Sequence, residues 1–192
     1  MDMNPLLKEL LQIHEYPIPN RTDSLNWNKA ANGKPAFGGI YAFWWKSSPR
    51  AFLQAMGNRT LHFHGPGGES LCWELRLRDL ARATNGLIPL YVGKNSSDIA
   101  RRVGLHLKLK TQRTVDAAAV GGICRRMTTS CQIRDRLDRL FPQFRDTRPV
   151  ALQNLALSYV RIDGDQGFVR RFFYENLAIG ELRPVFNVDS ER

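Results

Sequence analysis

Four residues near the middle of the chain form a candidate phosphate-binding group. Tyr91 closes a short apolar run, Lys94 follows a glycine, and Arg102 and His106 come next along the chain. Arg102 and His106 are four residues apart, so a helix would place both side chains on one face. A phenol, two cations and an imidazole suit an anionic phosphate better than carbon-centred chemistry.

A single carboxylate, Glu175, is the candidate metal ligand. On a helix it shares a face with Phe168, Phe172 and Ile179, an otherwise apolar surface. Burying an ionised acid on such a face is costly unless the acid pairs with a cation or binds a metal. Two interpretations stay open: an ion pair with a nearby arginine, or a ligand for a divalent cation.

The elements that must position these residues can be predicted from the apolar pattern. Strand-forming side chains predict a strand over 37–45, where Gly38 and Gly39 allow close backbone approach. A second strand is predicted over 88–92, breaking at Gly93, and an amphipathic helix from about 97 to 109 follows it. We expect that helix to be capped by one of two serines, Ser96 or Ser97.

Alternating segments at 60–64 and 71–75 predict a hairpin, and a third strand is expected over 155–160. Further helices are predicted near the N-terminus and over about 47–56, 77–84, 133–140 and 168–180. The expected fold class is α+β: one domain over 1–192, with a small, mainly antiparallel sheet flanked by helices. Residues 1–36 are interpreted as a helix with a wrapping segment, and 47–86 as an insertion carrying the hairpin.

The net charge favours a polyanionic partner. The chain has 28 Lys and Arg against 18 Asp and Glu, a formal charge of +10. Clustered arginines pair well with phosphates, although a solvated basic surface is the alternative. Nucleic acid is favoured over a membrane, since no apolar run approaches the roughly 20 residues of a spanning helix. The candidate phosphate contacts beyond His106 are Lys108, Lys110, Arg113, Arg125 and Arg126.

The cysteines indicate a reducing compartment. Cys72, Cys124 and Cys131 are an odd number without the CxxC spacing of a zinc site, so reduced thiols and a cytoplasmic location are expected. The N-terminal segment also lacks the features of a signal peptide.

The ordered set of motifs resembles the GIY-YIG nuclease superfamily. Gly39-Ile40-Tyr41 and Tyr91-Val92-Gly93 match its two tripeptides, and they are followed by Arg102, His106, Glu175 and Asn187. In that family the tripeptides lie on neighbouring antiparallel strands, the Arg and His on the next helix, and the Glu on a later helix.

The chain departs from the family pattern in two places. The tyrosines of the two tripeptides are 50 residues apart, where the family usually has a short hairpin. One additional residue before the Arg position makes Arg101 a competitor, and we prefer Arg102 because it places His106 one helical turn further on.

The resemblance implies a metal-dependent endonuclease that hydrolyses DNA phosphodiester bonds. Glu175 would hold one divalent cation, Mg²⁺ or Mn²⁺, and Arg102 would neutralise charge in the transition state. Tyr41 would take the proton from the attacking water, with Lys94 or His106 favouring its phenolate form. His106 itself is the competing candidate for the base.

Two further roles follow from the same resemblance. Tyr91 would position water or phosphate, while Asn187 would hold the phosphate or orient Glu175. A restriction-type enzyme is preferred, with double-stranded DNA as the partner and a homodimer as one arrangement. The alternatives are a repair or mobile-element nuclease acting with partners, and a catalytically idle DNA-binding module. Within the insertion, Arg59, His62 and His64 are the candidate base contacts.

The basic segments lead to a testable prediction. We expect DNA affinity to fall steeply with salt, because a side chain that neutralises a phosphate releases counterions; each such side chain adds about 0.9 to the logarithmic slope. Replacing both Arg125 and Arg126 with glutamine should therefore flatten the slope by about two. Fluorescence anisotropy over a salt series measures this slope, and affinity that does not change with salt contradicts the prediction.

Overall fold

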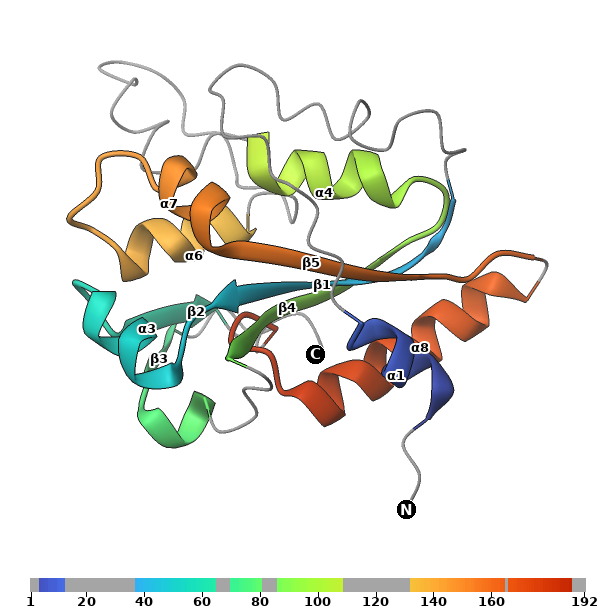
Figure 1. Cartoon of the computed structure of the whole chain (residues 1–192), viewed down its shortest axis with the longest axis horizontal. Coiled ribbons are helices and arrows are strands. Elements are labelled where there is room, and N and C mark those ends of the chain that lie inside the picture. The colour runs from blue at the N-terminus through green and yellow to red at the C-terminus, as the bar shows by residue number, and fades with distance from the viewer. Residues whose placement is uncertain are drawn as a thin grey trace.

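The computed structural model describes residues 4–12, 37–64, 70–80, 86–108, 132–164 and 166–187. A three-stranded antiparallel sheet lies between two groups of helices, and a separate two-stranded sheet lies beside it (Figure 1). The elements in chain order are α1 (Pro5–Leu10), β1 (Gly39–Lys46), α3 (Pro49–Ala55), β2 (Thr60–His64), β3 (Ser70–Glu74), the 3-10 helix η1 (Leu77–Leu80), β4 (Leu87–Asn95), α4 (Ile99–Lys108), α6 (Gln132–Leu140), α7 (Arg148–Asn154), β5 (Leu155–Arg161) and α8 (Gly167–Leu182).

The α+β class and the small antiparallel sheet flanked by helices are confirmed. Strand β1 is central, with β4 on one side and β5 on the other. Tyr41 lies opposite Gly93 on β4 and opposite Tyr159 on β5. The expected break at Gly93 is wrong: β4 runs on to Asn95, because Gly39 and Ile40 continue to pair with it.

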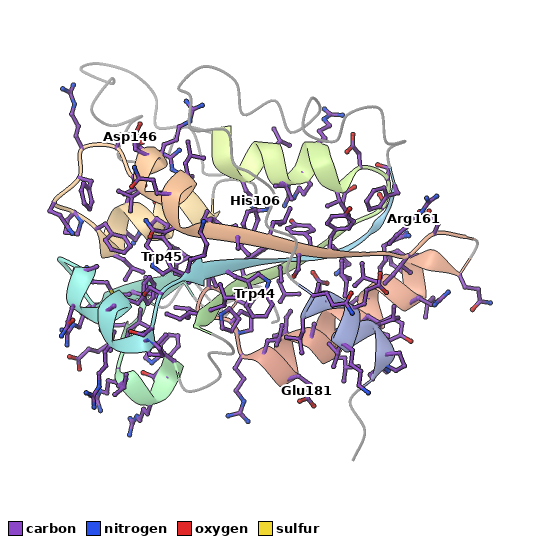
Figure 2. The ribbon with its side chains drawn as sticks, in the orientation of Figure 1. Trp44, Trp45, His106, Asp146, Arg161 and Glu181 are labelled. Carbon is purple, nitrogen blue, oxygen red and sulfur yellow. The ribbon has the colours of Figure 1, made fainter. Side chains whose placement is uncertain are left out.

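Strand β1 is buried on both faces, so its alternate side chains enter two different cores. One core joins the sheet to α4, α6 and α7 and receives Tyr41, Phe43 and Trp45. The other joins it to α1 and α8 and receives Ile40, Ala42 and Trp44. Trp44 donates its indole N–H to Ser158 Oγ at 2.8 Å, which satisfies the one polar atom of this buried side chain (Figure 2).

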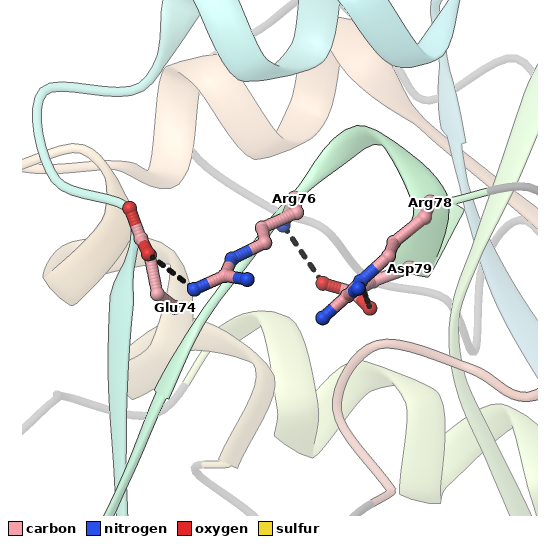
Figure 3. A network of polar contacts seen from close by, with 4 residues as sticks. All are labelled: Glu74, Arg76, Arg78 and Asp79. Atoms are coloured by element: carbon pink, nitrogen blue, oxygen red, sulfur yellow. Dashed lines mark hydrogen bonds and ion pairs between the residues drawn. The ribbon is translucent and has the colours of Figure 1, made fainter.

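The predicted hairpin is present as the antiparallel pair β2–β3, which Leu61 and Leu75 anchor in the first core. The expected helix over 77–84 is described only as the 3-10 helix η1, since 81–85 lie outside the described residues. Beside it, Arg76 pairs with Glu74 at 3.2 Å and donates its backbone N–H to Asp79 at 2.8 Å, while Arg78 lies 3.9 Å from Asp79 (Figure 3). The exposed Arg76–Glu74 pair contributes little to stability.

The start of α4 corrects one prediction. Neither Ser96 nor Ser97 caps this helix: Asp98 Oδ1 accepts the backbone N–H of Arg101 at 2.8 Å. Asn95 Oδ1 accepts the N–H groups of Ser97 and Asp98, which fixes the turn so that Asp98 reaches the cap position.

Helices α1 and α7 complete the fold. Helix α1 is capped by Asn4, whose side chain accepts the N–H of Leu6, whereas the predicted wrapping segment over 13–36 lies outside the described residues. Helix α7 was not predicted, because seven residues with a proline near the start show little periodicity. None of the described helices has the length and apolarity needed to cross a membrane.

Candidate active site

The centre of the site is a buried contact between Tyr41 on β1 and His106 on α4. Tyr41 Oη and His106 Nε2 are 2.9 Å apart, and neither side chain is exposed to solvent. Figure 2 shows His106 between α4 and the sheet. Two residues 65 positions apart in the sequence thus share a hydrogen bond in a desolvated environment.

Tyr91 and Arg102 complete this group. The Tyr91 ring lies 6.3 Å from that of Tyr41 and 5.3 Å from the His106 imidazole, measured between centroids. Arg102 is half-buried and forms a side-chain hydrogen bond with Tyr41, whereas Arg101 is exposed. Arg102, and not Arg101, is therefore the arginine beside Tyr41.

Burial raises the pKa of the Tyr41 phenol far above its ordinary value, and Tyr91 and Glu175 act in the same direction. Arg102 lowers this pKa through its charge and its hydrogen bond, but the desolvation is larger. Burial also raises the pKa of Tyr91, against the opposing charges of Arg102 and Arg136. Burial thus opposes the phenolate form of Tyr41 that neighbouring cations were expected to favour.

Glu175 pairs with a lysine, not with an arginine. Its Oε2 accepts from Lys94 Nζ, and the two side chains are 15% and 34% exposed. The Lys94 ammonium also lies 5.1 Å from the centroid of the Phe172 ring. The ion pair places Glu175 at the edge of the sheet, where α8 lies along β4.

The apolar face assigned to Glu175 is not buried. Phe168 and Phe172 are 69% and 54% exposed, so the reason given for a buried carboxylate is wrong. The face of α8 that contacts the sheet is instead formed by Gly167, Arg171, Ala178 and Leu182. Arg171 is tolerated there because its guanidinium donates to the Ile162 carbonyl at 2.8 Å. Glu175 lies at the boundary between this face and solvent.

Asn187 has a different role from the predicted one. Its side-chain oxygen accepts the Val92 N–H at 2.7 Å, and its amide nitrogen donates to the Val92 carbonyl at 2.8 Å. The backbone N–H groups of Val185 and Phe186 donate to Pro89 and Leu90. Asn187 thus bonds to β4 as a residue of a neighbouring strand would. It holds Val92, the residue between Tyr91 and Gly93. The predicted role was to contact phosphate or to orient Glu175.

Close approach explains the glycines of both tripeptides. A Cβ on Gly93 would lie 2.7 Å from Tyr41 Oη and 2.8 Å from a ring carbon of Tyr91. A Cβ on Gly39 would lie 2.0 Å from the Val160 carbonyl oxygen, and one on Gly38 would lie 2.4 Å from that of Ser96. The predicted close backbone approach at Gly38 and Gly39 is confirmed, and Gly93 makes room for the Tyr41 hydroxyl.

The metal prediction can be compared with the side chains near Glu175. In the described part of the chain, no three His, Cys, Asp or Glu side chains gather into a metal-binding group. Mg²⁺ does not require one, because it commonly keeps several waters and takes one or two carboxylates with substrate phosphates. An ionised carboxylate whose present counter-charge is a flexible lysine fits this mode of binding.

Only some of the residues predicted to contact DNA lie among the described residues. Arg59 is exposed just before β2, and Lys108 is the last residue of α4. The remaining four, Lys110, Arg113, Arg125 and Arg126, lie outside the described residues.

Arg136 on α6 was missed as a neighbour of the site. It is 6% exposed, lies 5.9 Å from the Phe186 ring and acts electrostatically on Tyr91. The alternating charges of 134–139 are typical of a solvated helix, so the sequence held no signal for its position.

A comparison with protein-family models finds no match to this chain, and searches of curated proteins and of solved structures find none either. The functional assignment therefore depends on the residues and their geometry.

The packing around Gly93 leads to a stability prediction. Gly93→Ala should lower the free energy of unfolding by about 1–3 kcal/mol, because its Cβ overlaps the Tyr41 and Tyr91 rings. Gly180→Ala is the matched control: this helical glycine has open space around it, so alanine should raise stability by about 0.5–1 kcal/mol. Denaturant unfolding measures both, and equal stability of the two variants would contradict the packing at Gly93.

Proposed function

We propose that this protein is a metal-dependent DNA endonuclease with a GIY-YIG nuclease-like fold. A restriction-type enzyme remains the preferred biology. The observation that carries the proposal is the gathering of Tyr41, Tyr91, Arg102 and His106 from two strands and one helix. Glu175 reaches the same edge of the sheet from α8 and acts electrostatically on both tyrosines. Core packing alone does not require this combination of polar groups in that order along the chain.

The contact between Tyr41 and His106 suggests how a proton leaves the attacking water. A phenolate is unfavourable in this buried site, so Tyr41 acts best as a relay. Tyr41 Oη accepts the water proton while its own proton passes to His106 Nε2, at 2.9 Å. This relay combines the two candidate bases: His106 is the final acceptor, and Tyr41 is the group that contacts water.

The cations of the site complete the chemistry. Arg102 donates to the phosphate oxygens as charge develops in the transition state, a contribution of about 3–4 kcal/mol for such a donor. Glu175 would hold Mg²⁺ or Mn²⁺, and the bound cation would polarise the scissile phosphate and stabilise the leaving oxygen. Lys94 pairs with the Glu175 carboxylate and orients it.

The first functional prediction concerns Glu175. Glu175→Gln should lower the cleavage rate by about 10²–10³-fold while retaining the fold and DNA binding, because the amide keeps the shape but loses the charge. Glu181→Gln is the matched control, an exposed carboxylate on the same helix (Figure 2) that should cut at the wild-type rate. Plasmid digestion with Mg²⁺, with EDTA as a second control, gives the rates. If Glu175→Gln cuts DNA at the wild-type rate, the assignment of Glu175 as a metal ligand is wrong.

The second functional prediction concerns the relay. Tyr41→Phe and His106→Ala should each lose about 10²–10⁴-fold in cleavage rate, whereas Tyr91→Phe should be milder and Tyr174→Phe, the control, unaffected. An imidazole acceptor predicts a wild-type rate that levels off near neutral pH. A phenolate base predicts a rate that keeps rising into alkaline pH, because burial raises the pKa of Tyr41. The pH–rate profile distinguishes them. If the His106→Ala enzyme cuts within a fewfold of the wild-type rate, His106 is not the acceptor of the Tyr41 proton, and the relay is contradicted.

A further inference from the structure

Helix α8 carries a cluster of exposed apolar side chains directly beside Glu175. Phe168, Val169, Phe172 and Phe173 are 69%, 63%, 54% and 57% exposed. They lie within two turns of the helix, on the side that faces away from the sheet. We call these four residues the apolar ledge. Exposed apolar clusters of this kind mark binding surfaces, whereas single exposed apolar residues do not.

The ledge is connected to the candidate active site through Lys94. The Lys94 ammonium lies 5.1 Å from the Phe172 ring centroid and bonds the Glu175 carboxylate. Phe172 thus stands next to the position assigned to the metal and the scissile phosphate.

The surroundings of the ledge are basic. Arg170 is exposed within the same helical segment. Arg161, at the end of β5, lies instead over the Phe37 ring at 5.6 Å, on the face of the sheet opposite α8. Asp163 pairs with Arg161 and reduces this charge locally. Together with Lys94 and the net charge of +10, Arg170 favours a partner that is both aromatic and anionic.

We infer that the apolar ledge stacks bases that have left the DNA helix next to the scissile phosphate, so that the substrate is DNA with an unpaired or readily unstacked step at the cut. This inference rests on the proposed function. Phenylalanine rings carry no hydrogen-bonding groups and contact only the faces of bases, which are covered in a regular duplex. Exposed apolar side chains next to phosphate-binding cations act in this way when they insert at a base step or stack on single-stranded nucleotides.

A second copy of this chain is a less suitable occupant. A two-fold contact through the ledge would bring Lys94 and Arg170 close to the same residues of the partner copy. Like charges facing one another across an interface oppose association, whereas phosphates neutralise them.

The test compares two DNA duplexes of one sequence, one of which carries a short central bubble, bound by the full-length protein in EDTA so that no cleavage occurs. Wild-type protein should bind the bubble more tightly. A variant with Phe168→Leu and Phe172→Leu keeps apolar area but loses stacking, and it should lose about tenfold in affinity for the bubble. Phe172→Trp should retain the affinity. Phe144→Leu is the matched control, an exposed phenylalanine in the loop after α6.

The outcomes separate this inference from the proposed function. If wild type cuts DNA but binds both duplexes equally, or if the double leucine variant binds the bubble like wild type, the ledge does not stack bases, and the nuclease assignment stands. If wild type neither binds nor cuts either DNA, both proposals fail. Analytical ultracentrifugation adds a third outcome: a wild-type dimer that the double leucine variant dissociates would assign the ledge to self-association and overturn the inference.

Discussion

The burial of β1 on both faces and both edges is the constraint on which the rest of this structure depends. With β4 and β5 as neighbours and helices above and below, each side chain from Ile40 to Trp45 is removed from water. Apolar residues accept this without difficulty, but Tyr41 cannot, because its hydroxyl needs a partner. His106 and Arg102 supply that partner from α4. The same burial that makes the fold stable therefore raises the pKa of the phenol.

The edge of β4 is covered along one part of its length and accessible along another. Residues 185–187 pair with its first half, and Asn187 satisfies both backbone groups of Val92. Beyond that point Gly93 leaves space for the Tyr41 hydroxyl, and Lys94 turns to Glu175. One strand edge is thus covered where stability requires it and left accessible where Glu175 and Lys94 lie. Helix α8 contributes both a covered and an accessible surface. It buries Arg171 against the sheet and exposes the apolar ledge next to Glu175.

Much of this arrangement could be predicted from local signals. The alternation of 155–160, the aromatic run of 37–45 and the amphipathic helix after Gly93 each follow from side-chain periodicity, and the corresponding elements are present. The choice between Arg101 and Arg102 also followed from local geometry, since only one of them lies a single helical turn from His106. Gly38 and Gly39 indicated close packing, because glycine is the residue that permits it.

What only the tertiary structure decided is the environment of each group. The sequence by itself determined which residues are present and which helical or strand face they share. It could not determine that the Phe168–Phe172 side of α8 faces solvent, because an apolar stripe has the same period whether or not another element covers it. Nor could it determine that desolvation of Tyr41 outweighs the charge of Arg102, or that Lys94 is the counter-charge of Glu175. These outcomes depend on distances between residues far apart in the chain, and electrostatic energies depend on distance and burial rather than on position in the sequence.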